Sequence, residues 1–91
     1  MSVVLKLGSS SITLDPSRPR VFAGRDPAAC QLAFLDAGLS RRHAEIWIDQ
    51  TGQAYLRDLG SSNGSWVNGQ PLGPHPVPLG PGQQVYLGTV P

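Results

Sequence analysis

The chain has 91 residues, a formal net charge of +1 and a single cysteine, Cys30. This length suits one domain, and one cysteine excludes an intramolecular disulfide framework, so we expect Cys30 to be a buried small hydrophobe. The near-neutral balance argues against a general polyanion binder, which usually carries a clear basic excess. No Cys/His cluster has zinc-ligand spacing, so neither a metal nor a cofactor is expected.

The apolar runs are too short to cross a membrane, and the N-terminus lacks the charged start and apolar core of a signal peptide. We therefore expect a cytoplasmic domain without membrane insertion. Five of the six arginines fall within one third of the chain, at positions 18, 20, 25, 41 and 42. This clustering allows a local anion-binding surface, although a surface ion pair with Asp26 or Asp36 is the ordinary alternative for Arg25.

Eleven glycines and nine prolines interrupt the chain, and apolar residues nowhere keep helical spacing over a helical length. Short strands separated by turns are therefore expected. The expected strands are residues 3–7, 11–14, 20–24, 31–35, 43–49, 54–59, 65–67, 70–72, 77–79 and 83–88. Strands of this length at spacings of about 8–12 residues predict an all-β domain, either a sandwich or a barrel.

The clearest alternation lies in "HAEIWID", residues 43–49. Side chains of a strand point alternately to its two faces, so Ala44, Ile46 and Ile48 share one face and Glu45 and Trp47 the other. The aliphatic face is expected to contact the core.

Two Asn-Gly pairs, Asn63-Gly64 and Asn68-Gly69, stand only five residues apart. Asn-Gly favours a tight hairpin turn because both residues tolerate positive φ, but two such turns crowd one short segment. We predict that Asn68-Gly69 forms the turn between "SWV" and "QPL". Asn63 is then left to display its side chain, with Gly64 giving its loop a left-handed step.

Three polar loops interrupt the expected strands, and each is rich in hydrogen-bond donors. They are "AGRD" (23–26), "GLSRRHAE" (38–45) and "LGSSNGS" (59–65). Loops at one end of a sandwich lie side by side, so these segments can form one site. A phosphate on a peptide needs a guanidinium, hydroxyls and free N–H groups at one point, and Arg25, Ser40, Arg41 and Ser62 supply this set.

Ser40, His43 and Asp58 also supply the residue types of a hydrolase triad. Ser40 and His43, however, stand together where one strand begins, and no strand-turn-helix elbow surrounds the serine. We therefore expect no catalysis.

The motifs "GR" (24–25), "LSRRHAEI" (39–46) and "DLGSSNGSWVNG" (58–69) together resemble the forkhead-associated (FHA) domain, a phosphothreonine-peptide-binding family. The resemblance covers residues 3–88. It implies an eleven-stranded β-sandwich of two antiparallel sheets whose loops at one end bind a phosphorylated peptide, with no catalysis and no metal.

The resemblance also assigns roles to matching residues. Gly24 matches the glycine that allows a sharp turn, and Arg25 matches the arginine that pairs with the phosphate. Ser40 corresponds to the serine that reaches a phosphate oxygen, and Arg41 to a basic or polar residue near the phosphate. His43 matches a histidine that holds the serine loop in place.

Ser62 matches a threonine or serine that contacts the phosphate or the peptide, and Asn63 matches the asparagine that bonds the peptide main chain. Two positions depart from the family, which usually has threonine where this chain has Ser62 and Ser65. The loss of a methyl group at Ser62 leads to the hypothesis that selectivity for phosphothreonine over phosphoserine is looser here.

The end of the chain also departs from the family, because only residues 89–91 remain where a last strand would pair with residues 3–7. The last strand is therefore short or missing. We expect residues 1–91 to be a single module of a longer protein; the alternative is that residues 3–7 expose an edge that pairs with another copy.

The function expected from these residues is recognition of threonine-phosphorylated partner segments in kinase-dependent signalling. A phospho-independent assembly module that uses its sheet face is the first alternative. The second is a small β-barrel for single-stranded nucleic acid, which would need Arg41, Arg42, Trp47 and Trp66 interleaved on one surface. The near-neutral charge argues against nucleic acid.

Overall fold

The computed structural model describes residues 3–7, 10–17, 19–34, 38–73, 75–80 and 83–88. These residues contain ten strands and no helix, so none of them forms a helix that could span a membrane. The strands are β1 Val3–Leu7, β2 Ser10–Leu14, β3 Arg20–Gly24, β4 Leu32–Ala33, β5 Ala44–Ile48, β6 Ala54–Asp58, β7 Ser65–Val67, β8 Gln70–Pro71, β9 Val77–Leu79 and β10 Val85–Leu87.

Five strands form the larger sheet, in the order β4-β3-β5-β6-β9. All of its pairs are antiparallel except β3 with β4. The central register aligns Val21, Ile46 and Leu56 across three strands, and all three side chains are buried. Because alternate residues of a strand share one face, this register turns a continuous aliphatic row toward the core.

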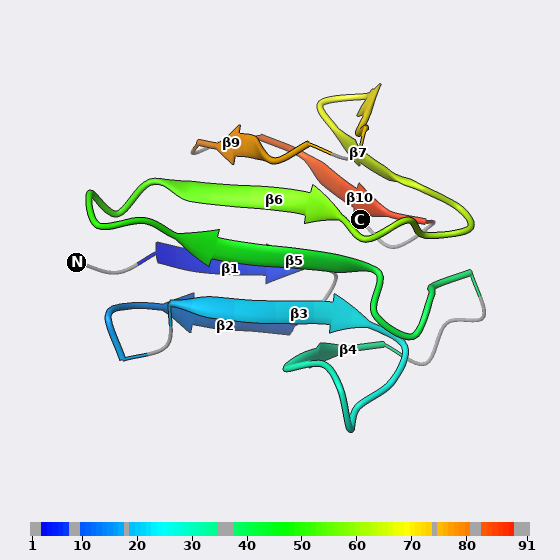
Figure 1. Cartoon of the computed structure of the whole chain (residues 1–91), viewed down its shortest axis with the longest axis horizontal. Helices are drawn as coiled ribbons and strands as arrows, with labels where there is room; N and C mark the ends of the chain where they lie inside the picture. The colour runs from blue at the N-terminus through cyan, green and yellow to red at the C-terminus, as the bar shows by residue number, and fades with distance from the viewer. Residues whose placement is uncertain are drawn as a thin grey trace.

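The opposing layer consists of the β1–β2 hairpin and a three-stranded sheet in the order β10-β7-β8. Figure 1 shows β1, β2 and β10 lying behind the larger sheet. The core cluster joins the two layers, because Leu14 of β2, Val67 of β7 and Leu87 of β10 are buried together with the aliphatic row. The all-β sandwich expected from the sequence is therefore confirmed.

All ten expected strands are present within the described residues, and those around β5 have nearly the expected bounds. The fourth and tenth are shorter than expected, at Leu32–Ala33 and Val85–Leu87. Asn68 and Gly69 have φ values of 52° and 79°, which makes them the two-residue turn of the β7–β8 hairpin, as predicted. The last strand expected after residue 88 lies outside the described residues.

The outer face of the larger sheet holds one feature that alternation does not predict. Glu45 is only 5% exposed although it points away from the core. Arg57 on β6 and Arg20 on β3 flank it, at 2.9 Å and 3.2 Å from its carboxylate oxygens. The two guanidinium groups therefore compensate the charge of the buried carboxylate.

Candidate functional site

Three polar loops meet at the end of the sandwich where β3 and β6 finish and β5 begins (Figure 1). The described parts of these loops, residues 24–26, 38–43 and 58–64, are called the binding end below. The predicted convergence of the loops is thus seen, and hydrogen bonds link each loop to another.

The first link joins the end of β3 to the loop before β5. The N–H of Arg25 donates to the Ser40 carbonyl at 3.0 Å, and that of Asp26 donates to the Arg41 carbonyl at 3.2 Å. A Cβ atom on Gly24 would overlap the Arg41 carbonyl oxygen and lie 2.9 Å from the Ser40 carbonyl oxygen. Gly24 therefore allows the two backbones to approach this closely.

His43 makes the second link, from a fully buried position. Its Nδ1 accepts the Ser40 N–H at 3.2 Å, so its Nε2 carries the proton and donates to the Gly64 carbonyl at 2.7 Å. The same side chain thus fixes the serine loop and the asparagine loop relative to each other. This geometry agrees with a scaffolding role for His43.

Asp58 organises the third loop from the end of β6. Its Oδ2 accepts the N–H groups of Gly60 and Ser61, and its Oδ1 accepts the hydroxyls of Ser61 and Ser65 at 2.5 and 2.6 Å. Burial alone would raise the pKa of this carboxyl, but the hydrogen bonds from Ser61 and Ser65 outweigh it and hold the pKa below its usual value. The ionised carboxylate is therefore part of the loop's structure.

Two further contacts place the exposed polar groups of the site. The Ser62 N–H donates to the Ser40 Oγ at 3.2 Å, which joins the two serines expected to contact a phosphate. The Asn63 side-chain amide donates to the Gly38 carbonyl at 2.7 Å. Asn63 is exposed, and this bond orients its amide at the rim of the binding end.

The arginines of the binding end differ in their surroundings. No described carboxylate pairs with Arg25, which is exposed. Asp26 instead pairs with Arg41, at 3.5 Å, so the ion pair between Arg25 and Asp26 considered from the sequence does not form; Asp36 lies outside the described residues. The guanidinium of Arg42 lies 4.4 Å from the centre of the Phe22 ring.

The hydrolase triad and the nucleic-acid surface do not assemble from the residues considered for them. Both nitrogens of the His43 ring are engaged by main-chain groups, so neither is directed to the Ser40 hydroxyl. Trp47 belongs to β5 in the larger sheet and stacks on Tyr55, whereas Trp66 belongs to β7 in the other layer. The two tryptophans therefore do not form one base-stacking surface.

Cys30 is buried and its Sγ lies 3.1 Å from the Arg41 carbonyl. Burial raises the pKa of the thiol, and the nearby Asp26 carboxylate raises it further. The expectation of a buried small hydrophobe is confirmed.

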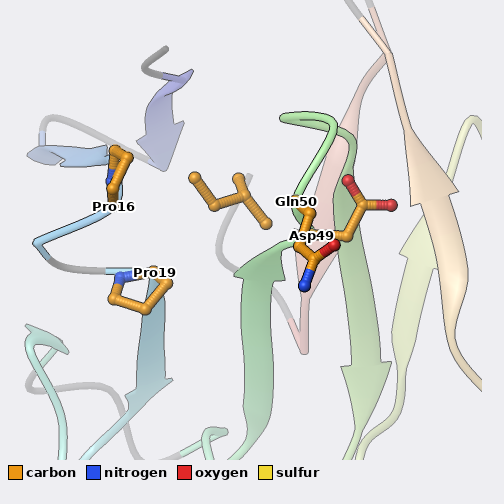
Figure 2. Close-up of a pocket in the computed structure, with 5 residues that line it drawn as sticks. Pro16, Pro19, Asp49 and Gln50 are labelled. Atoms are coloured by element: carbon orange, nitrogen blue, oxygen red, sulfur yellow. The ribbon is translucent and has the colours of Figure 1, made fainter.

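The far end of the larger sheet, where β3 begins and β5 ends, carries a cavity of about 480 Å³. Figure 2 shows Pro16 and Pro19 on one side of it and Asp49 and Gln50 on the other. The Asp49 carboxylate accepts the hydroxyl of Thr51, and this bond lowers the pKa of Asp49. The described lining holds no cationic side chain, so this cavity is not suited to a phosphate.

Sequence reasoning missed two contributors to the binding end. Asp58 was considered only as a triad member, although an aspartate followed three residues later by a serine is a signal for a side-chain-capped turn. Asp26 was considered only as a partner of Arg25. The structure makes Asp26 the partner of Arg41 instead.

Comparison with known proteins gives one family match, the FHA domain, over residues 21–88. Curated relatives include an uncharacterised Schizosaccharomyces pombe protein, 45% identical over 56 residues, which cover 60% of this chain and 19% of that protein. An FHA domain-containing protein of Arabidopsis thaliana is 41% identical over 66 residues, covering 71% of this chain and 17% of that protein. The match thus spans less than a fifth of each relative's length.

Solved structures match over nearly the whole chain. The FHA domain of the CT664 protein from Chlamydia trachomatis superimposes with a TM-score of 0.88 and 31% identity, covering 99% of this chain and 92% of that one. A structure described as an analysis of phosphothreonine-dependent FHA domain interactions gives a TM-score of 0.83 and 33% identity, covering 99% and 91%. The MEK1 FHA domain, solved in complex with a HOP1 phosphothreonine peptide, gives 0.81 and 25%, covering 96% and 89%.

Proposed function

Because the chain belongs to the forkhead-associated (FHA) domain family, we propose that it binds threonine-phosphorylated segments of partner proteins through the binding end. In this proposal Arg25, Ser40, Arg41 and Ser62 hold the phosphate, and Asn63 holds the peptide main chain. Gly24, His43 and Gly64 support the site without contacting the ligand.

The observation that carries the proposal is an exposed arginine, without an ion-pair partner among the described residues, whose backbone is bonded to one of two linked serines. Arg25 has no ion-pair partner among the described residues, and its own N–H is bonded to the carbonyl of Ser40. The Ser40 hydroxyl is in turn 3.2 Å from the Ser62 N–H. A phosphate dianion needs this combination of one cation and several donors on a fixed scaffold.

Two similar domains support the choice of ligand. One is described as taking part in phosphothreonine-dependent interactions, and another was solved with a phosphothreonine peptide. Charge-assisted hydrogen bonds contribute about 1.5–3 kcal/mol each before desolvation and peptide ordering are subtracted, so we expect affinities in the micromolar range.

The partner is a substrate of a protein kinase, and the domain is a non-catalytic module that brings its host protein to that partner in the cytoplasm. We propose that residues 1–91 are one module of a longer protein.

A phosphothreonine-oriented peptide library, followed by titration calorimetry with the selected peptide, tests the proposal. The phosphorylated peptide should bind at micromolar concentration and its unphosphorylated form should not. Arg25→Ala should abolish binding and leave the unfolding midpoint unchanged, because Arg25 is exposed. Arg42→Ala is the matched control, since its guanidinium lies over Phe22. Equal binding of both peptide forms would instead select the phospho-independent assembly module.

Two further measurements test the role of Asn63 and the selectivity between phosphothreonine and phosphoserine. Asn63→Ala should weaken binding of the phosphorylated peptide without abolishing it. Phosphoserine and phosphothreonine forms of the same peptide should bind with similar constants if the absence of a methyl group at Ser62 loosens selectivity. A tenfold or larger difference between the two forms would contradict that hypothesis.

A further inference from the structure

Asp26 follows Arg25 in the chain and pairs with Arg41, the other arginine of the proposed phosphate site, and three contacts fix its position. Its N–H donates to the Arg41 carbonyl at 3.2 Å, and its Oδ1 accepts the N–H of Ala28 at 2.9 Å. Its Oδ2 lies 3.5 Å from the guanidinium of Arg41. The first two contacts do not depend on Arg41's side chain, so the carboxylate stays at the site when that side chain moves.

The ion pair between Asp26 and Arg41 is loose. The Arg41 side chain is 79% exposed, and its 3.5 Å separation from the carboxylate is longer than a good charge-assisted hydrogen bond. The Asp26 side chain is 25% exposed, but an ion pair whose arginine is this exposed still contributes little to stability, because water solvates the guanidinium. A phosphate dianion can therefore draw the Arg41 side chain away from Asp26.

Binding of a phosphate changes which charged group compensates the Asp26 carboxylate. In the free domain Arg41 compensates Asp26, and Arg25 has no described partner. In the complex the two positive charges of Arg25 and Arg41 are matched by the phosphate dianion, which leaves the Asp26 carboxylate uncompensated. Arg42 does not replace the lost partner, since its guanidinium lies over the Phe22 ring.

We propose that Asp26 is a specificity-determining residue that favours phosphothreonine segments with a lysine or arginine beside the phosphothreonine. This inference rests on the proposed function of the binding end. A basic side chain of the peptide pairs with the Asp26 carboxylate in place of Arg41. An acidic side chain of the peptide is instead repelled by that carboxylate. Without Asp26, the arginines of the loops would favour acidic peptides, so this one carboxylate decides the sign of the preference.

The test compares phosphothreonine peptides of one sequence that carry lysine, alanine or glutamate, first directly before and then directly after the phosphothreonine. At one of the two positions, lysine should bind about threefold more tightly than alanine, and glutamate about threefold more weakly, as expected for single charges in solvent-exposed surroundings. The ratio of dissociation constants between the glutamate and lysine peptides, called the spread below, should shrink at high salt, where exposed charges are screened.

Asp26→Asn provides the matching variant, because its amide oxygen can still accept the Ala28 N–H. In this variant the spread between lysine and glutamate peptides should fall below about twofold or reverse, and the alanine peptide should bind more tightly. Asp15→Asn changes the net charge by the same amount, directly after β2 and beside Pro16 of the far-end cavity, and its amide oxygen can still accept the Ser17 N–H, so it is the control. Its spread should equal that of the unmodified protein.

The outcomes distinguish failure of the Asp26 role from failure of the phosphopeptide function. If phosphorylated peptides bind but neither position distinguishes lysine from glutamate, the role of Asp26 is wrong and the phosphopeptide function stands. A spread that persists in Asp26→Asn also overturns the role of Asp26. If phosphorylated and unphosphorylated peptides bind equally or not at all, both proposals fail together.

Discussion

Replacing His43 with alanine measures how strongly one side chain holds the binding end together. The imidazole is fully buried and connects the Ser40 N–H to the Gly64 carbonyl. Alanine removes both bonds and leaves a space where the ring was. We expect His43→Ala to lower the free energy of unfolding by more than any substitution of an exposed residue of the site.

The expected loss in the free energy of unfolding can be estimated from the two broken hydrogen bonds and the space left by the ring. The partly buried Ser40 N–H is left without its acceptor, which costs about 1–3 kcal/mol. The Gly64 carbonyl loses less, because it also accepts the Gly88 N–H at 2.9 Å. The space left by the ring adds about 1–2 kcal/mol of lost packing. The expected total is about 2–5 kcal/mol, a large share of the stability of a small domain.

Urea unfolding followed by tryptophan fluorescence measures this loss. With a slope of about 1 kcal/mol per molar urea, the midpoint of unfolding should fall by about 2–5 M. His75→Ala is the matched control, because His75 is exposed and should change the midpoint little. A loss below about 1 kcal/mol, or one equal to that of His75→Ala, would refute the scaffolding role derived from the two hydrogen bonds.

Three other predictions concern the supports of the site. Gly24→Ala should lower the free energy of unfolding by about 2–3 kcal/mol because its Cβ overlaps backbone atoms, whereas Gly60→Ala, at φ +74° in open space, should cost about 1 kcal/mol in urea titrations. The pKa of Asp58 is lower in the folded state than its ordinary value of 3.8, so its contribution to stability is complete above that value and is lost as pH falls through the folded pKa. Acid titrations of Asp58→Asn should therefore show a shallower decline than those of the unmodified protein. Cys30 should react with iodoacetamide only as fast as the domain opens, so urea below the transition should accelerate it and a rate equal to that of free cysteine would contradict its burial.

Much of the fold could be predicted from the sequence because glycines and prolines mark the strand ends. The β7–β8 hairpin is the clearest case, since Asn68 and Gly69 both adopt the positive φ that the pair predicts. Glu45 shows the limit of such reasoning. Its burial depends on Arg57 standing opposite Glu45 and Arg20 standing opposite Trp47 two residues along β5, and that register is set by tertiary packing rather than by local sequence.

The binding end could be predicted only in part. The three polar loops were identified from their composition, but the bonds between them join residues 15–25 positions apart, and spacing along the chain does not encode these. The pairing of Asp26 with Arg41 instead of Arg25 arises because the backbone of residues 25–26 runs beside that of residues 40–41.

The same geometry separates the residues of the loops into two groups with different physical consequences. Gly24 and His43 are buried and hold backbone segments together, so substituting them should change stability and ligand binding at once. Arg25 is exposed and has no ion-pair partner among the described residues, so substituting it should change binding alone, whereas substituting the exposed Asn63 also removes its bond to the Gly38 carbonyl. Measuring unfolding and binding on the same variants therefore distinguishes scaffold from ligand contact even before the partner is known. A variant of an exposed residue that lost stability and binding in parallel would show that the loop, and not the ligand, had been disturbed.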